Sequence, residues 1–418
     1  MSETGTMSLT LKIAGDGHDD FYPHELALDE GISRVYRATL TVFTKTARKQ
    51  KELRELLERK VSIIVSQRLA GGSVTRSRYV HGIVTNIANL GVASRGGGDP
   101  CFRHVITIES EFARLRHTRL NGPWYRKTPI DIIEEILSRY GVQAKFPDTY
   151  VNRGDFSKSL MLEQVDVSDL DFIRRLMDLY GISWTFAHGG VSRGGLGAAQ
   201  PYFSEGRSFP PPVYEYSDGR KIPEIERFDF LDSAGGRDIW GIDDWRMESS
   251  IGVDGLDITA NYPQSDRGSR EWRWGETGHG KRYHNYNTMF HGYQRGTPPE
   301  EIDADIKRII EAKKTAFVLQ KENRNGKTES ILPMPGLVLE VGHFYGKNDV
   351  EADTALVTAS RLHVRAMWPR DLVALPIGGD PGEAACVEFA AKTWGKDTEK
   401  RFAVSHCGRD CDGGERWN

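Results

Sequence analysis

The sequence predicts an α+β fold that is mainly β, with two small β-barrels, an inserted helix-strand module and an extended β region. Three observations predict it. Most segments alternate apolar and polar residues with the period of a half-buried strand. Two short units in the middle of the chain each combine a capped helix, a glycine and a strand. Strands, one charged helix and more strands occur near both ends, which indicates two related barrels.

The first predicted barrel covers residues 1–111. Its strands are expected in LTLKIAG, YRATLTVFT, VSIIVSQR, RYVHGIVTNIAN and FRHVITIES. One charged helix, ARKQKELRELLER, stands between the second and the third of these segments. Short strands that are separated by turns and rich in β-branched and aromatic residues are typical of a small barrel or a rolled sheet.

Residues 112–190 hold the two helix-strand units and form the predicted module. In VSDLDFIRRLMDLYGISWTFAH, Ser168 can cap a helix and Gly181 can end it in the left-handed conformation. Trp184 then falls on the apolar side of an alternating strand and is expected in the core. TPIDIIEEILSRYGVQAKF has the same arrangement, with Thr128 as the cap and a proline at the first helical position.

The rest of the chain divides into three predicted parts. Residues 191–218 are rich in Gly and Pro and are expected to form a loop or linker. Residues 219–405 are expected to form the extended β region, a helix in TPPEEIDADIKRIIEAKKT and the second barrel, and residues 406–418 a tail. Strands are expected in IERFDFLDS, REWRWGETGHGKRYHNYNTMFHGY, AFVLQKEN, LVLEVGHF, ALVTASRLHVRAM and ACVEFAAKTW.

The composition argues against several classes of protein. The 418 residues have a formal net charge of -3, whereas a protein that mainly binds nucleic acid or an anionic membrane is usually basic. No apolar run reaches the ~20 residues of a membrane span, and the N-terminus has no signal-type apolar core. Four cysteines are too few for a disulfide framework. We expect a chain made in the cytoplasm, with protein partners or small ligands.

One motif could carry hydrolase chemistry. The segment 190–194 matches G-x-S-x-G, and this places Ser192 after a strand. A nucleophile elbow needs a helix directly after its serine, but the next residues are glycine, leucine, glycine and two alanines. A flexible loop is the favoured interpretation. A serine hydrolase that uses Ser192 is kept as an alternative function.

No metal or cofactor site is predicted. The GKT at 326–328 is similar to the end of a phosphate-binding loop, but Lys321 stands where the first glycine of that loop should be, so a hairpin turn is expected. His406, Cys407 and Cys411 could bind a metal, although their spacing is not a zinc signature and an ordinary tail is favoured.

Two further stretches could bind ligands. Aromatic residues between 272 and 293 could form a sugar or base platform, as in a carbohydrate-binding module, but core or subunit interface is favoured. They are Trp272, Trp274, Tyr283, Tyr286, Phe290 and Tyr293. A basic stretch could face nucleic acid, but in a near-neutral chain a solvated or intersubunit face is favoured. Its residues are Arg114, Arg116, Arg119, Arg126 and Lys127.

Several segments together resemble a known family. RYVHGIVTNI, FRHVITIESEFARLRHTRLNGPWYRKTPIDIIEEIL and SLMLEQVDVSDLDFIRRLMDLYGISWTF are similar, in order and spacing, to the hub segment of the valine-glycine repeat protein G of type VI secretion and to phage late control protein D. KRYHNYNTMFHGYQRG and SILPMPGLVLEVGHF look like the continuation of that segment. The resemblance covers most of residues 8–365, and its motifs are structural.

The resemblance implies a structural baseplate or spike hub of a contractile injection system, either a phage or prophage tail or type VI secretion, without catalytic residues. It implies a homotrimer whose paired barrels match a threefold spike at one end and a sixfold tail tube at the other. The chain would be made in the bacterial cytoplasm and assembled into a phage tail, virion or secretion apparatus, with export left open. No oligonucleotide fold or β-helical spike follows the second barrel, so the spike is expected from another chain or from a longer product.

Overall fold

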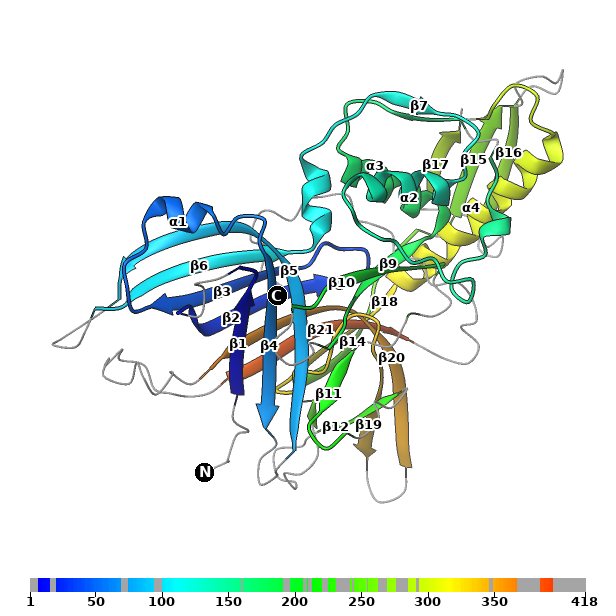
Figure 1. Ribbon diagram of the computed structural model, residues 1–418. Helices are drawn as coiled ribbons and strands as arrows, with labels where there is room; N and C mark the ends of the chain where they lie inside the picture. The colour runs from blue at the N-terminus through cyan, green and yellow to red at the C-terminus, as the bar shows by residue number, and fades with distance from the viewer. Residues whose placement is uncertain are drawn as a thin grey trace.

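The structure is a computed structural model of the chain. The described residues are 7–15, 20–68, 74–93, 100–158, 161–190, 196–205, 209, 213–219, 225–230, 241–242, 244–253, 255–261, 269–275, 285–290, 293–345, 349–366 and 384–393. They form two groups of strands and a module of helices and short sheets that projects from them (Figure 1). The prediction of an α+β fold that is mainly β is confirmed.

The first strand group has six antiparallel strands in the spatial order β1–β4–β5–β6–β3–β2. Their bounds are β1 (Met7–Ile13), β2 (Tyr22–Gly31), β3 (Arg37–Thr44), β4 (Lys60–Arg68), β5 (Thr75–Val92) and β6 (Phe102–Glu109). The short strand β11 (Tyr214–Tyr216) pairs with β5. Alternate residues of these strands bury one apolar face, as the sequence predicts.

Two expectations for this group need correction. The charged helix expected over 47–59 is only α1 (Gln50–Arg54). It ends early because Glu58 takes a positive φ of 63° and its amide donates to the carbonyl of Val84, which returns the chain to β5. The strand β2 was not predicted, because Leu26 and Leu28 give only a short apolar alternation among charged residues.

The second strand group continues the same sheet from β2. Its strands are β12 (Glu226–Phe230), β13 (Gly241–Ile242), β14 (Asp244–Ser249), β18 (Glu322–Thr328), β19 (Val338–Tyr345), β20 (Asp349–Arg365) and β21 (Ala384–Thr393). Pairing runs from β13 through β12, β19, β20, β21 and β18 to β14, which follows β13 after one residue. Closure of a barrel by hydrogen bonds is not found in the described part of the chain, so the two barrels stay a prediction.

Two local predictions in this group are wrong. The GKT at 326–328 is not a hairpin turn, because Gly326 lies inside β18 and pairs with Trp245 on one side and Phe389 on the other. A Cβ on Gly326 would lie 2.3 Å from the ring of Phe389, so the glycine allows close packing. The strand expected in AFVLQKEN begins only at Glu322, because α4 (Pro299–Gln320) continues through the first five of those residues.

Lys392 of β21 contacts the backbone where α4 ends and β18 begins. Its ammonium donates to the carbonyls of Leu319, at 2.5 Å, and of Glu322, at 2.7 Å. A cation at this position satisfies carbonyls at the helix terminus and interacts favourably with the helix dipole. Burial lowers the pKa of Lys392 to about 8.

The helix-strand units of the module have the predicted caps. They contain α2 (Pro129–Arg139) and α3 (Asp169–Tyr180), preceded by β7 (Gly122–Trp124) and β8 (Leu162–Gln164). The hydroxyls of Thr128 and Ser168 each accept from the backbone amide three residues later, both at 3.1 Å. Gly181 ends α3 with a φ of 68°. The prediction of two capped helices is therefore confirmed.

The two units are related by a regular offset that the sequence analysis did not resolve. The two capping residues, two left-handed residues and two glycines with positive φ are each 40 positions apart: Thr128 and Ser168, Arg126 and Asp166, Gly141 and Gly181. β7 and β8 pair antiparallel, with Pro123 opposite Glu163, which is also 40 positions away. The units thus face each other across a pseudo-twofold axis at this pair.

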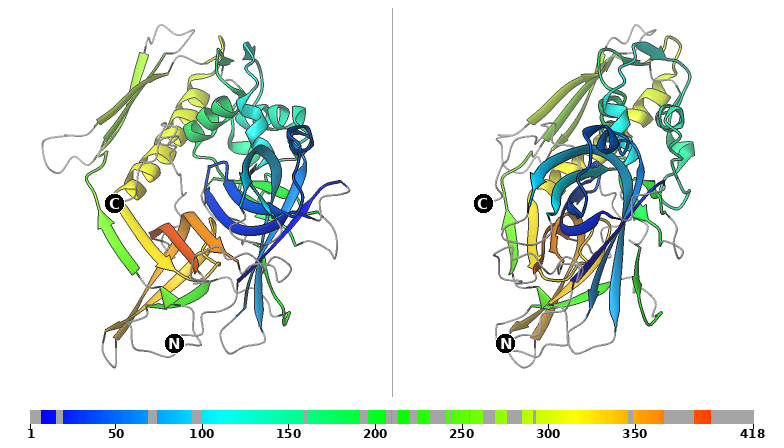
Figure 2. Two further views of the ribbon diagram at one scale, coloured as in Figure 1. Left: turned by 90° about the vertical axis from the view of Figure 1, so that its left-hand side faces the viewer. Right: turned by 60° about the vertical axis from the view of Figure 1, so that its left-hand side comes forward.

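The apolar faces of α2 and α3 are covered by a distant part of the chain. They share a second hydrophobic core with α4 and with β15 (Gly255–Asn261), the central strand of a sheet that also contains β16 (Ser269–Gly275) and β17 (Asn285–Phe290). The hydroxyls of Tyr180 and Tyr293 both donate to Asp305 of α4. Figure 2 shows α4 running from this sheet toward the second strand group.

The domain boundaries predicted from the sequence, at residues 111, 190, 218 and 405, remain a proposal.

The module meets the first strand group through β9 (Ser183–His188), which pairs with β10 (Ala199–Ser204). Trp184 of β9 is fully buried, and its ring lies 6.1 Å from that of Phe112. The amide of Ser33, in the turn after β2, donates to the carbonyl of Trp184 at 2.8 Å. The prediction that Trp184 belongs to the core is confirmed.

We expect Trp184→Ala to lower the free energy of unfolding by ~3–5 kcal/mol, because it leaves a large cavity where the module meets the strands. Equilibrium unfolding in denaturant measures the loss. Tyr125→Ala is the matched control, since the side chain of Tyr125 is exposed and its removal should cost less than ~0.5 kcal/mol. A loss below about 1 kcal/mol for Trp184→Ala would contradict its place in the core.

Candidate functional site

The described residues on both sides of the G-x-S-x-G motif lie beside the first strand group. Residues 191–195, with Ser192, lie outside the described residues, but the flanking glycines are described. The carbonyl of Gly189 lies 2.6 Å from Nε2 of His81, and the amide of Gly197 donates to Oγ of Ser62 at 2.9 Å. The residues before and after the undescribed segment 191–195 are therefore hydrogen-bonded to β5 and β4, respectively.

Ser62 and His81 form a serine–histidine pair that the sequence analysis did not identify. Oγ of Ser62 lies 2.9 Å from Nδ1 of His81. Both residues are fully buried, and Nε2 of His81 contacts the carbonyl of Gly189. A catalytic serine must reach a substrate, and its histidine needs a nitrogen that can take and deliver a proton. This pair is enclosed, and it holds β4, β5 and the returning segment together.

His188 extends this cluster into the module. Its Nδ1 accepts a hydrogen bond from the amide of His81 at 3.0 Å, so this nitrogen is unprotonated. Burial, followed by the nearby His81 and Arg78, holds the pKa of His188 well below its usual value. Burial also lowers the pKa of His81, against the hydrogen bond to Gly189. The contact between module and strands therefore requires neutral histidines.

A buried ion pair of the first strand group is hydrogen-bonded to the second. The guanidinium of Arg78, on β5, contacts the carboxylate of Glu30, on β2, and donates to the carbonyl of Ile331 at 3.3 Å. The hydroxyl of Ser360, on β20, donates to the same carboxylate at 2.6 Å. The side chain of Gln67 adds two hydrogen bonds to the backbone near Ile331. The network contacts both groups and fixes one against the other.

The aromatic residues between 272 and 293 contribute to the second core. Trp272 and Tyr293 are buried there, and Trp274 is half-buried. Tyr283 lies outside the described residues, and the side chains of Tyr286 and Phe290 are not described. The described rings do not form an exposed platform, which favours the core interpretation over a carbohydrate-binding module.

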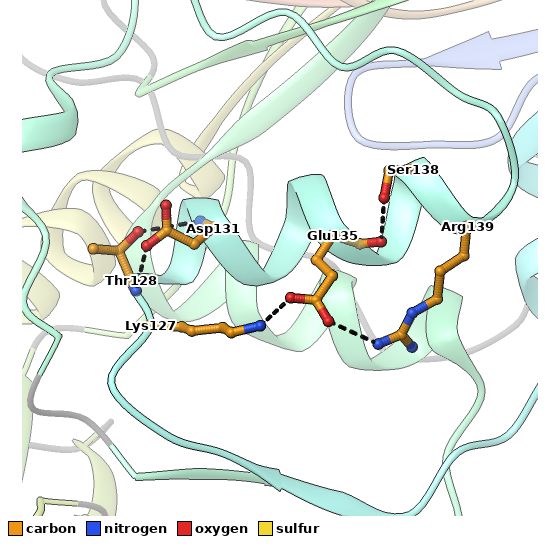
Figure 3. Close-up of polar contacts among 6 residues, drawn as sticks. All are labelled: Lys127, Thr128, Asp131, Glu135, Ser138 and Arg139. Carbon is orange, nitrogen blue, oxygen red and sulfur yellow. Dashed lines mark hydrogen bonds and ion pairs between the residues drawn. The ribbon is translucent and has the colours of Figure 1, made fainter.

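Most of the basic stretch is paired with carboxylates. The ion pairs are Arg114–Glu58, Arg116–Glu109, Arg119–Asp166 and Lys127–Glu135. Glu135 also accepts from Arg139, so two cations hold one carboxylate on the surface of α2 (Figure 3). The hydrogen bond from Lys127 is the main reason why the pKa of Glu135 is lowered. This pairing leaves less free charge for nucleic-acid phosphates.

No cofactor or membrane feature is found in the part of the chain that the structure describes. Its His, Cys, Asp and Glu residues form no group of three or more that could hold a metal. The tail candidates His406, Cys407 and Cys411 lie outside it. None of its helices is long and apolar enough to span a membrane.

The comparisons with known proteins match part of the chain to a tail hub family and most of it to known tail and secretion folds. Residues 29–199 match the family model described as phage tail baseplate hub (GPD). This range runs from the end of β2 to the start of β10 and includes both helix-strand units. No curated protein sequence matches the chain. The resemblance drawn from the sequence is confirmed.

Three solved structures share the fold over almost the whole chain. The Escherichia coli c3393 protein, a type VI secretion component, has a TM-score of 0.57 at 14% identity, covering 94% of this chain and 80% of its own. A Neisseria meningitidis tail protein has a TM-score of 0.55 at 8% identity, with 93% and 96% covered. A tail protein of prophage MuSo2 from Shewanella oneidensis has 0.52 at 9%, with 92% and 98% covered. These identities show a common fold.

We expect the stability of the protein to fall as the pH drops below about 6.5. An unfolded histidine has a pKa near 6.5, whereas burial lowers the pKa of His24, His81, His104 and His188 in the folded protein. The unfolded chain therefore binds more protons below this pH, and each such histidine removes up to about 1.4 kcal/mol of stability per pH unit. Above pH 6.5 this contribution is fully present.

Denaturant unfolding between pH 8 and pH 5 measures this dependence. His81→Gln removes one titrating group and should flatten the slope, even if it lowers stability at every pH. The same free energy of unfolding at pH 7.5 and pH 5.5 would show that these histidines are not held neutral by the fold.

Proposed function

We propose that this chain, a structural hub protein of a contractile injection system, works as a homotrimer that joins a tail tube to a spike. The observation that carries the assignment is the match of residues 29–199 to the baseplate hub family, on a chain whose whole described fold is that of tail and secretion hubs. The homotrimer, the tube and the spike go beyond this observation and are the proposal.

The pairing of two strand groups in one chain supports the trimer. β2 and β20 join the groups by a continuous antiparallel register from Glu25–Arg365 to Gly31–Ala359. Three copies would supply six strand groups around an axis, which can match a threefold spike at one end and a sixfold tube at the other. The hydrogen bonds from Arg78 to Ile331 and from Ser360 to Glu30 hold the second group against the first, and such a ring requires a fixed arrangement of the two groups.

The proposed role is structural rather than catalytic. The one serine–histidine pair identified in the described residues, Ser62 with His81, is enclosed. Ser192 remains outside those residues, so the hydrolase alternative is not favoured by any observed geometry. We propose that the chain is made in the cytoplasm and acts in a phage tail or a type VI apparatus through protein contacts. It would bind neither specific nucleic acid nor a cofactor.

We expect the purified protein to be a trimer with three times the 47.0 kDa mass of the chain. The reason is that a hub must present threefold symmetry to its spike. Multi-angle light scattering at micromolar concentration measures the mass, and a dilution series in the same experiment separates a stable trimer from weak association. A monomer throughout the series would contradict the proposed trimer.

A further inference from the structure

Exposed large apolar side chains gather in distinct places. Four flank the paired strands β7 and β8 of the module, which we call the ribbon, namely Leu120, Tyr125, Met161 and Val165. Three belong to the first strand group: Leu57, Leu90 and Val92. Near the second group and its helix are Ile225, Met247, Ile251 and Val318. Exposed apolar side chains that cluster indicate contact surfaces, whereas scattered ones do not.

The strand β14 is exposed over most of its length. Trp245 packs on that core beside Phe389, but residues 246–251 are all exposed, with 64% of Met247 and 85% of Ile251 accessible. Among the described strands, β14 pairs with β18 alone, so one edge and both faces of this stretch are open. An exposed edge strand with apolar side chains can pair with or pack against another chain.

The exposed residues at this end form one surface. The amide of Ser250 donates to the carbonyl of Lys321 at 2.8 Å, which brings Ile251 beside the last turn of α4 and therefore near Val318. Glu248 is exposed and forms no ion pair within the described residues. We call Met247, Glu248, Ile251 and Val318 the β14 surface. It is apolar with one free negative charge.

A surface with the opposite charge lies at the end of the β5–β6 hairpin. Asn89 pairs with His104 and Val92 with Phe102, and the bulge between them places Leu90 near Arg103. Leu90 is 49% and Val92 is 63% exposed. Arg103 is exposed and also forms no ion pair within the described residues. We call Leu90, Val92 and Arg103 the hairpin surface.

We propose that the β14 surface of one copy of this chain binds the hairpin surface of the next copy, head to tail, and that this contact closes the trimer. The inference rests on the proposed homotrimer. The β5–β6 hairpin ends at the left of Figure 1, whereas β14 lies at the left edge of the left view in Figure 2, which is turned by 90°, so the two surfaces lie on different sides of the strand groups. A cyclic trimer needs two different, complementary surfaces on each subunit, which a threefold rotation brings together.

Charge and position favour a second copy over another partner. Glu248 would meet Arg103, and the apolar side chains on each side would cover one another. The ribbon of the module lies away from both surfaces (Figure 1) and would remain outside this contact. The ribbon also carries exposed apolar side chains. Replacing one of them with a charged residue is therefore a matched control for the same kind of substitution on the two proposed surfaces.

The test uses two double variants of the full chain, Met247→Glu with Ile251→Glu and Leu90→Glu with Val92→Glu. Each should raise the dissociation constant of the trimer by ~30-fold or more in sedimentation velocity. Val165→Glu on the ribbon should leave the trimer intact. Unchanged thermal unfolding of the isolated subunits, or retained circular dichroism, shows that the variants fold.

Mixing the two double variants tests the direction of the contact. Each retains the surface that the other has lost, so a head-to-tail contact predicts a one-to-one dimer of twice the chain mass. A mixture that stays monomeric would overturn the proposal. A symmetric contact between the β14 surfaces of two copies would not join the two double variants to each other. Formation of the one-to-one dimer would therefore exclude a symmetric contact.

A charge exchange tests the specific pair. Glu248→Arg and Arg103→Glu should each weaken the trimer by about 10-fold, and the combination should restore it to within about 3-fold of the wild type. If the wild type is trimeric but all variants keep full affinity, this contact is wrong and the proposed function stands. If the wild type is monomeric, both the contact and the proposed trimer fail.

Discussion

The fold depends on one shared strand. β2 pairs with β3 of the first strand group and with β20 of the second, so a single sheet passes through both groups. The carboxylate of Glu30 on this strand accepts from Arg78 on β5 and from Ser360 on β20. A buried charge is tolerated only when its partners are in place, and therefore this network permits one arrangement of the two groups.

The module depends in turn on a helix that is distant in sequence. α2 and α3 have strong local caps, but their apolar faces are buried only because α4 and β15 return to cover them. α4 also reaches the second strand group, where Lys392 holds its last carbonyls. The same helix thus links the module to the strand groups. A hub needs this rigidity, because its ends must keep a fixed relation while they bind different partners.

Local patterns in the sequence were sufficient to predict much of the fold. Thr128 and Ser168 could be identified as caps because a hydroxyl and the amide three residues later are close in any helix that starts there. The strand β2 could not be predicted from the sequence, because its alternation of apolar and polar residues is short. The end of α4 was misplaced because the cation that satisfies its carbonyls comes from residue 392. The Arg78–Glu30 pair also has no sequence signal, because both residues resemble solvent-exposed charges until β2 and β5 are brought together.

The central claim is that the chain joins a tube to a spike. The most direct measurement is co-expression of the full chain with the tube and spike proteins encoded beside its gene, followed by affinity capture and negative-stain imaging. The account predicts that both partners are captured together and that rings about as wide as a tail tube carry a spike on one face. Capture of neither partner, with no ring in the images, would contradict the assignment as a hub even though the fold is that of one.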